Sequence, residues 1–215
     1  VGRVVGAGSS LRIATKAHPS GHDGGLSPEG LTAQFRTSLA AMQVPAVDVL
    51  YLHQPDGAHS LASTMEAATL LVKQGLASSL GISNFSTAET ARLFQMCEDE
   101  GYSKPTVFQG LYNPINRRVE ADLLPLLKQH GVSFVAYNPL AAGLLTGKHT
   151  KGAAPPDGRF KDNPNYLDRF YRDSDFDALA IIRAACDSAG LSMVEASYSW
   201  LLHDSALTAS DGLLL

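Results

Sequence analysis

The chain has 215 residues, of which 45% are hydrophobic and 18% are charged, and its formal net charge is −4. A balance of 17 basic against 21 acidic residues gives no electrostatic reason to bind nucleic acid. No apolar run is long enough to predict a membrane span, and no signal-peptide pattern opens the chain. The length fits one domain, or at most two.

The two cysteines, Cys97 and Cys186, lie far apart and form no paired motif. Cys97 falls on a helical face that reads as buried, so we expect a small apolar filler there. Unpaired cysteines indicate a reducing compartment, and we expect the protein to be cytoplasmic.

Short apolar runs alternate with helical patterns along the first two thirds of the chain. Ser27 followed by Pro28 predicts the start of the first helix. Ser86 and Glu89 form an S-x-x-E capping box at the start of a later helix, and another helix is expected over 120–130. Strands are predicted over residues 11–17, 47–54, 79–84, 106–113 and 133–140.

The spacing of the predicted strands indicates a β/α repeat. Their starts recur every roughly 30 residues, which is the length of a β/α unit. The strands are apolar on both faces, as is typical of a parallel sheet covered by helices. This alternation alone permits an open doubly wound sheet or a (β/α)₈ barrel.

Composition changes after residue 140. Residues 147–165 are rich in glycine, proline and charge, and loops this long are usually functional. Helices are expected near 175–189 and 193–203, and the final residues resemble the start of another strand. Residues 1–10 are predicted to be a flexible leader.

Polar side chains follow the predicted strands at their carboxyl ends, where ligands bind in parallel α/β folds. A single one would be explained as a solvated rim residue, but five consecutive strands with such groups predict a ligand site. His18 and His22 are not added to this ligand site, because they lie in a Pro/Gly-rich turn that reads as a solvated loop. The histidines show no metal-ligand spacing. The strand-end residues are Lys16, His53, Ser83, Asn84, Tyr137 and Asn138, and Gln109 lies within the fourth predicted strand.

Several segments together resemble the aldo-keto reductase family, and most of all its aflatoxin-aldehyde (succinic semialdehyde) reductase subgroup. The resemblance implies a (β/α)₈ barrel that reduces aldehydes and ketones with NADPH. The segments are ATK (14–16), YLHQPD (51–56), GISNFS (81–86), YNP (112–114), AYNPLAAGLLTGK (136–148) and GRF (158–160), together with Gln109.

The resemblance also implies roles for individual residues. Lys16 matches the lysine that lowers the pKa of a catalytic tyrosine, and His53 the histidine that orients the substrate carbonyl. Tyr137 matches the aromatic residue stacked on the nicotinamide ring. The nicotinamide carboxamide would be held by Ser83, Asn84 and Gln109. The pyrophosphate and further cofactor contacts would come from Asn138, Pro139, Leu140, Gly143, Leu145, Gly147, Lys148 and Arg159. Ala142 departs from the family, where glycine is common.

Two functional groups of the family have no match. The catalytic aspartate and tyrosine of relatives precede the ATK segment, and VGRVVGAGSS contains neither residue type. Tyr51 shares a strand face with His53, but deeper in the sheet, and is only a weak substitute. We therefore expect a partial barrel over residues 11–215, truncated at both ends, with about strands 3 to 7 and the start of strand 8.

Three functional readings follow. The first is a piece of an NADPH-dependent carbonyl reductase that is inactive as this chain, with a small carbonyl compound as substrate and homodimer formation left open. The second is a non-catalytic cofactor-binding or regulatory module, as in channel-associated relatives. The third is a remnant that barely folds.

Overall fold

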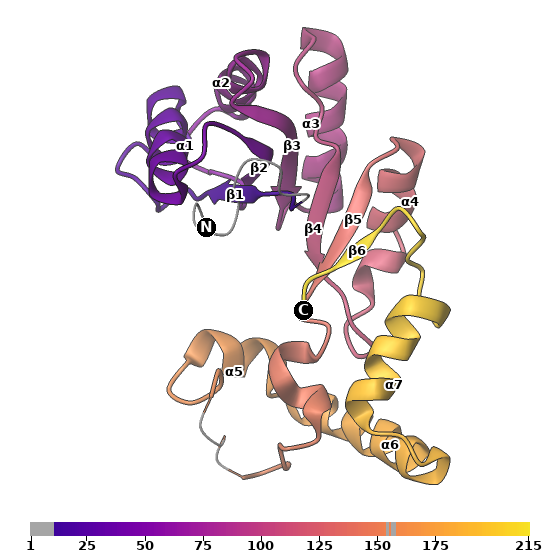
Figure 1. Cartoon of the computed structure of the whole chain (residues 1–215). Coiled ribbons are helices and arrows are strands. Elements are labelled where there is room, and N and C mark those ends of the chain that lie inside the picture. The colour runs from indigo at the N-terminus through magenta and orange to yellow at the C-terminus, as the bar shows by residue number, and fades with distance from the viewer. Residues whose placement is uncertain (1–10, 154, 156–157) are drawn as a thin grey trace. The chain divides into compact units, whose positions relative to one another are not determined.

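The computed structural model describes residues 11–153, 155 and 158–215, so the predicted leader at 1–10 lies outside the described residues. The chain forms two compact units (Figure 1). Unit 1 comprises Val1–Gln109 and Leu126–Ser133, and unit 2 comprises Gly110–Pro125 and Phe134–Leu215. Across the described ranges, no helix is both long and apolar enough to cross a bilayer.

Unit 1 is an α/β layer of parallel strands and helices. Its strands pair in chain order, with Lys16 opposite Tyr51, Tyr51 opposite Gly81 and Ser83 opposite Gln109. Consecutive parallel strands require a crossover, and a helix supplies each one. The elements are β1 (Ala14–Ala17), α1 (Pro28–Met42), β2 (Val47–Leu52), α2 (Leu61–Lys73), β3 (Ala77–Ser83), α3 (Thr87–Glu100) and the first part of β4 (Val107–Leu111).

Local sequence signals explain the helix boundaries of unit 1. The Ser27 side chain accepts a hydrogen bond from the Gly30 amide, and Pro28 occupies the first turn of α1. The predicted capping box of Ser86 and Glu89 is formed in both directions at the start of α3. Cys97 is buried on α3, and burial raises the pKa of its thiol to about 11, which confirms a packing role.

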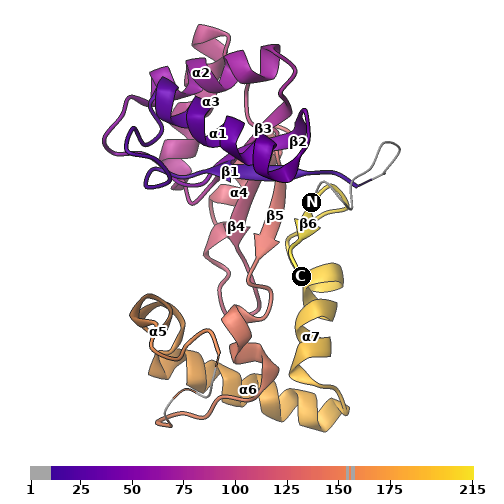
Figure 2. The ribbon, with the colours of Figure 1, turned by 60° about the vertical axis from the view of Figure 1, so that its left-hand side comes forward.

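Unit 2 contains a further pair of parallel strands and a helical layer. Val135 lies opposite Gly212 and Ala136 opposite Leu213 in this pair. Helices α6 and α7 follow one another and contact each other (Figure 2). The elements are a 3₁₀ turn (Arg118–Glu120), β5 (Ser133–Tyr137), a 3₁₀ segment (Ala141–Thr146), α5 (Pro164–Phe170), α6 (Asp173–Ala189), α7 (Met193–Ser199), a π-helical turn (Trp200–Asp204) and β6 (Gly212–Leu213). Helix α4 (Leu123–Gln129) and strands β4 and β5 contain residues of both units.

The structure corrects several predicted boundaries. The helix expected over 120–130 begins at Leu123 after the 3₁₀ turn, and Pro125 is tolerated in its first turn, where no amide partner is needed. Helix α5 was not predicted, and its first two residues fall inside the predicted loop 147–165. The helix expected to end near 203 widens into a π-helical turn at Trp200. The centre of the Trp200 ring lies 5.4 Å from the centre of the Tyr112 ring.

The aromatic side chains of unit 2 explain helix α5. Phe160 and Phe170 are 2% exposed and belong to one apolar core with Leu144, Leu145 and Phe176. A seven-residue helix is marginal by propensity alone, so this burial accounts for its formation.

Candidate active site

Four predicted site residues of unit 1 meet at the carboxyl ends of its strands. The His53 amide donates to the Ala17 carbonyl (2.9 Å), so the end of β1 holds the residue that follows β2. The Asn84 side-chain amide donates to the His53 carbonyl (2.9 Å) and to the Ser83 hydroxyl (3.1 Å). Ser83 in turn lies opposite Gln109 in the sheet register. Parallel pairing therefore brings these groups to one edge, as predicted.

Lys16 and His53 form the charged part of this edge. Burial lowers the pKa of the Lys16 ammonium. Burial also lowers the pKa of His53, and the positive charges of His18 and Lys16 lower it further. The neutral imidazole is thus favoured. A neutral imidazole can donate a hydrogen bond to a carbonyl oxygen, and a nearby ammonium stabilises negative charge that develops there.

Tyr51 supports Lys16 and is poorly suited to be a proton donor. The Lys16 ammonium lies 4.9 Å from the centre of the Tyr51 ring, within the range of a cation–π contact. Tyr51 is 5% exposed, and burial raises the pKa of its hydroxyl. A Cβ added at Gly81 would lie 2.5 Å from the Tyr51 ring. Gly81 therefore leaves the space that the ring under Lys16 occupies.

In unit 2 the predicted cofactor loop has an unusual backbone. Asn138, Ala141, Ala142 and Gly143 all have positive φ, at 54°, 49°, 57° and 113°. The Ala141 and Gly143 amides donate to the Asn138 and Leu140 carbonyls (2.9 and 2.8 Å), so the turn is closed by its own hydrogen bonds. The Asn138 carbonyl also accepts from the Asn113 side-chain amide (3.0 Å), so the start of the loop is anchored.

A cavity of about 430 Å³ lies against this loop, within the size range of small-molecule sites. Arg159 lines it and donates to the Asn138 side-chain oxygen (3.1 Å), which places a fixed cation beside the left-handed backbone. Six of the predicted cofactor residues line the cavity, namely Tyr137, Asn138, Pro139, Leu140, Gly143 and Arg159.

The three remaining predicted residues of the loop have other surroundings. Leu145 is completely buried in the apolar core, and its amide donates to the Leu140 carbonyl (3.2 Å). The Gly147 carbonyl accepts from the Arg183 guanidinium (2.7 Å). Lys148 is exposed. Leu145 and Gly147 thus shape the loop, whereas the Lys148 ammonium is accessible to an anion.

Sequence reasoning missed three residues beside the predicted ones. Arg169 donates to the Tyr137 hydroxyl (2.8 Å), but it lies on the unpredicted helix α5, and nothing local links the two positions. Tyr198 of α7 lines the 430 Å³ cavity. His18 packs against His53, with ring centres 5.0 Å apart. The segment is exposed from Ser20 to Asp23, as expected for a solvated loop, and His18 at its start is half-buried against the His53 ring.

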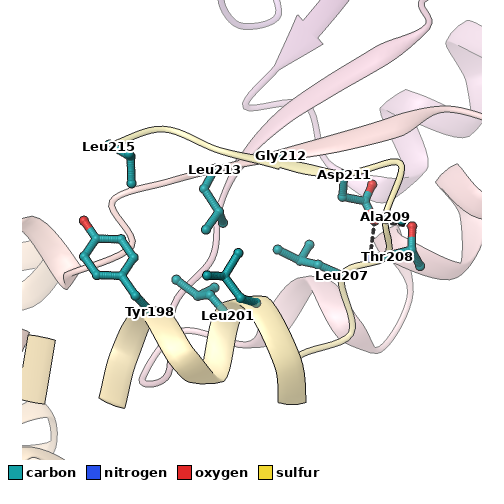
Figure 3. Close-up of a pocket in the computed structure, with 10 residues that line it drawn as sticks. Tyr198, Leu201, Leu207, Thr208, Ala209, Asp211, Gly212, Leu213 and Leu215 are labelled. Carbon is teal, nitrogen blue, oxygen red and sulfur yellow. Dashed lines mark hydrogen bonds between the residues drawn. The ribbon is translucent and has the colours of Figure 1, made fainter. Parts of the chain in front are cut away.

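A second cavity of unit 2, of about 870 Å³, lies beside β6, and half of its ten lining residues are leucines (Figure 3). Its acidic residue, Asp211, accepts hydrogen bonds from the Thr208 and Phe134 amides, both at 2.7 Å. That carboxylate therefore orders the turn before β6. Over the described ranges, no group of three histidine, cysteine, aspartate or glutamate residues could hold a metal ion.

Comparison with known proteins agrees with this geometry. A sequence profile described as the aldo/keto reductase family matches residues 1–210. The chain belongs to the aldo/keto reductase family. Members of this family are oxidoreductases that generally use NAD(P)H.

Individual relatives give the same result. The chain is 39% identical to aflatoxin B1 aldehyde reductase member 2 of Rattus norvegicus over 99% of its length, and 37% identical to the human aldo-keto reductase family 7 member A3 over 98%. It spans 60% and 66% of these two relatives. A solved glycerol dehydrogenase from Gluconobacter oxydans has the same fold, with a TM-score of 0.76 at 23% identity over 99% of this chain and 66% of that one.

The close fit between Gly81 and Tyr51 predicts the effect of a methyl group. Gly81→Ala is expected to destabilise the chain by about 1–3 kcal/mol, because the buried Tyr51 ring must move. Urea unfolding followed by circular dichroism measures this. Gly57→Ala is the matched control, because nothing lies within 4 Å of a Cβ there. A change within about 1 kcal/mol is expected for the control, and equal losses in both variants would contradict the prediction.

The left-handed conformation of Ala142 predicts a stabilising substitution. Ala142→Gly is expected to raise the unfolding free energy by about 1 kcal/mol, because the left-handed conformation at φ 57° is strained for alanine and not for glycine. Ala185→Gly on the exposed face of α6 is the matched control, and it should lower the unfolding free energy by about 1 kcal/mol. Thermal and urea unfolding measure whether each substitution raises or lowers the unfolding free energy. Destabilisation by Ala142→Gly would refute the assignment of strain.

Proposed function

We propose that this chain carries part of the site of an NADPH-dependent reductase that converts aldehydes or ketones into alcohols. The observation that carries the proposal is the pair formed by Lys16 and His53 at the carboxyl ends of β1 and β2. Membership of the aldo/keto reductase family supports it. Aldehyde reductases are also among the most similar curated relatives, although the chain spans only about 60% of their length.

The residues of unit 1 are suited to the carbonyl end of the reaction. Bound NADPH would supply a hydride to the carbonyl carbon. The oxygen then gains negative charge, which requires hydrogen-bond donors and positive charge nearby. His53, whose neutral form is favoured, donates a hydrogen bond to that oxygen, and the Lys16 ammonium stabilises the charge.

The residues of unit 2 are suited to the cofactor end. The loop from Asn138 to Gly143 borders the cavity, and Arg159 and Lys148 offer positive charge to a pyrophosphate. Tyr137 lines the same cavity as Arg159 and offers an aromatic face for the nicotinamide ring. We propose NADPH as the nucleotide, a small carbonyl compound as substrate, and the cytoplasm as the compartment.

The cofactor part of the proposal is tested by binding. NADPH fluorescence titrations should show saturable binding, and Arg159→Gln should weaken it about tenfold or more, because one charged contact to phosphate is lost. Lys151→Gln is the matched control, since this lysine of the same segment bonds to Asp177 at 2.6 Å. The control should bind like the parent chain. No binding at millimolar NADPH would refute this part.

The chemical step is tested by turnover. The 215-residue chain by itself is expected to show no detectable reduction of 4-nitrobenzaldehyde or succinic semialdehyde, because Tyr51, the tyrosine in contact with Lys16, has a raised pKa. Turnover that Lys16→Ala abolishes would overturn this expectation and show that another group donates the proton. NADPH binding without turnover is therefore the result expected of this chain, and the second candidate function, a non-catalytic cofactor-binding module, shares it.

A further inference from the structure

The loops that follow β1 and β2 bring two histidine rings together. The ring centres of His18 and His53 are 5.0 Å apart, and the ring planes are at 83°. This is an edge-to-face contact, the arrangement that aromatic rings prefer over a face-to-face sandwich. The family resemblance assigns a role to His53 and none to His18.

His18 is held from several directions. Its amide donates to the Gln34 side chain (2.9 Å), and its carbonyl accepts from the Gly21 amide (2.9 Å). Its ring Nδ1 accepts from the Ser20 amide (2.9 Å), so the neutral ring carries its proton on Nε2. The ring is therefore fixed in position and in tautomer by a tight turn and by α1.

His53 is held mainly through its backbone. Its amide donates to Ala17 and its carbonyl accepts from Asn84. These bonds fix the Cα position, but they leave the side-chain torsions to ring packing. The His18 ring supplies that packing, with its centre 5.0 Å from the centre of the His53 ring.

The charged groups near His53 lower the pKa of its imidazole. Lys16 of β1 and His18 of the following loop both disfavour the imidazolium form, in addition to burial. The Asn84 side-chain amide, which follows β3, donates to the His53 carbonyl, and the Gln34 side chain of α1 accepts from the His18 amide. Beyond His53 on its own loop, the Asp56 carboxylate is bonded to His59 at 2.9 Å and to the Leu26 and Ala58 amides.

We propose that His18 is a positioning residue for His53, fixing the orientation of its ring at the carboxyl end of β2. The role of His53 toward the carbonyl rests on the proposed function. The effect of His18 on the His53 ring does not depend on a cofactor, so it is measurable in the chain alone.

Nitrogen-15 and proton NMR spectra of the histidine rings, recorded from pH 5 to 8.5, test the proposal. In His18→Ala, the His53 ring protons should lose their ring-current shift, and the pKa of His53 should rise. In His18→Phe, the ring-current shift should persist while the pKa still rises, because an aromatic ring remains without a titrating group. His22→Ala is the matched control, since His22 is an exposed histidine of the same loop whose Nδ1 also accepts from a backbone amide.

Each outcome decides the proposal. It holds if the two His18 variants change the His53 signals as described and His22→Ala does not. It is overturned if His53 titrates and resonates unchanged in both His18 variants, or if His22→Ala causes the same changes. His18→Phe retains an aromatic ring at this position, so the His53 spectra of this variant decide the proposal if His18→Ala does not fold. Failure of NADPH to bind would refute the proposed function while leaving this result intact.

Discussion

The parallel pairing of β1, β2, β3 and the start of β4 is the constraint on which the candidate site of unit 1 depends. Parallel strands must all end at the same edge, and helical crossovers return the chain to the opposite edge each time. Lys16, His53 and Asn84 are far apart in sequence, yet this rule places them together. The short hydrogen bonds from His53 to Ala17 and from Asn84 to His53 then fix the register of the loops.

Within that edge, packing controls the chemistry. Gly81 gives space to the Tyr51 ring, which lies under the Lys16 ammonium. The same burial that supports Lys16 raises the pKa of Tyr51, so this residue is a structural platform rather than an acid. Unit 2 uses backbone geometry instead, because its left-handed residues and Arg159 border a cavity that can hold an anionic ligand. Ala142 accepts a strained, left-handed conformation there.

Much of this organisation was predictable because its signals are local. Apolar runs flanked by turns identify strands, and the Ser27 and Ser86 caps identify helix starts, since their hydrogen bonds close within three residues. Helix α5 was not predictable, because its apolar residues become informative only when Phe160 and Phe170 share a core with α6. The contacts of His18 and Arg169 were missed for a related reason: their partners lie 35 and 32 residues away in sequence.

The sequence by itself determined the α/β class, the order of the elements and the family, because periodicity, caps and the 136–148 segment are properties of neighbouring residues. It also identified which side chains follow each strand. Only the tertiary structure decided that Tyr51 is buried beneath Lys16, that Leu145 belongs to the core, and that His18 lies against His53. These facts depend on burial and on contacts between distant loops, and both arise only when the strands pair.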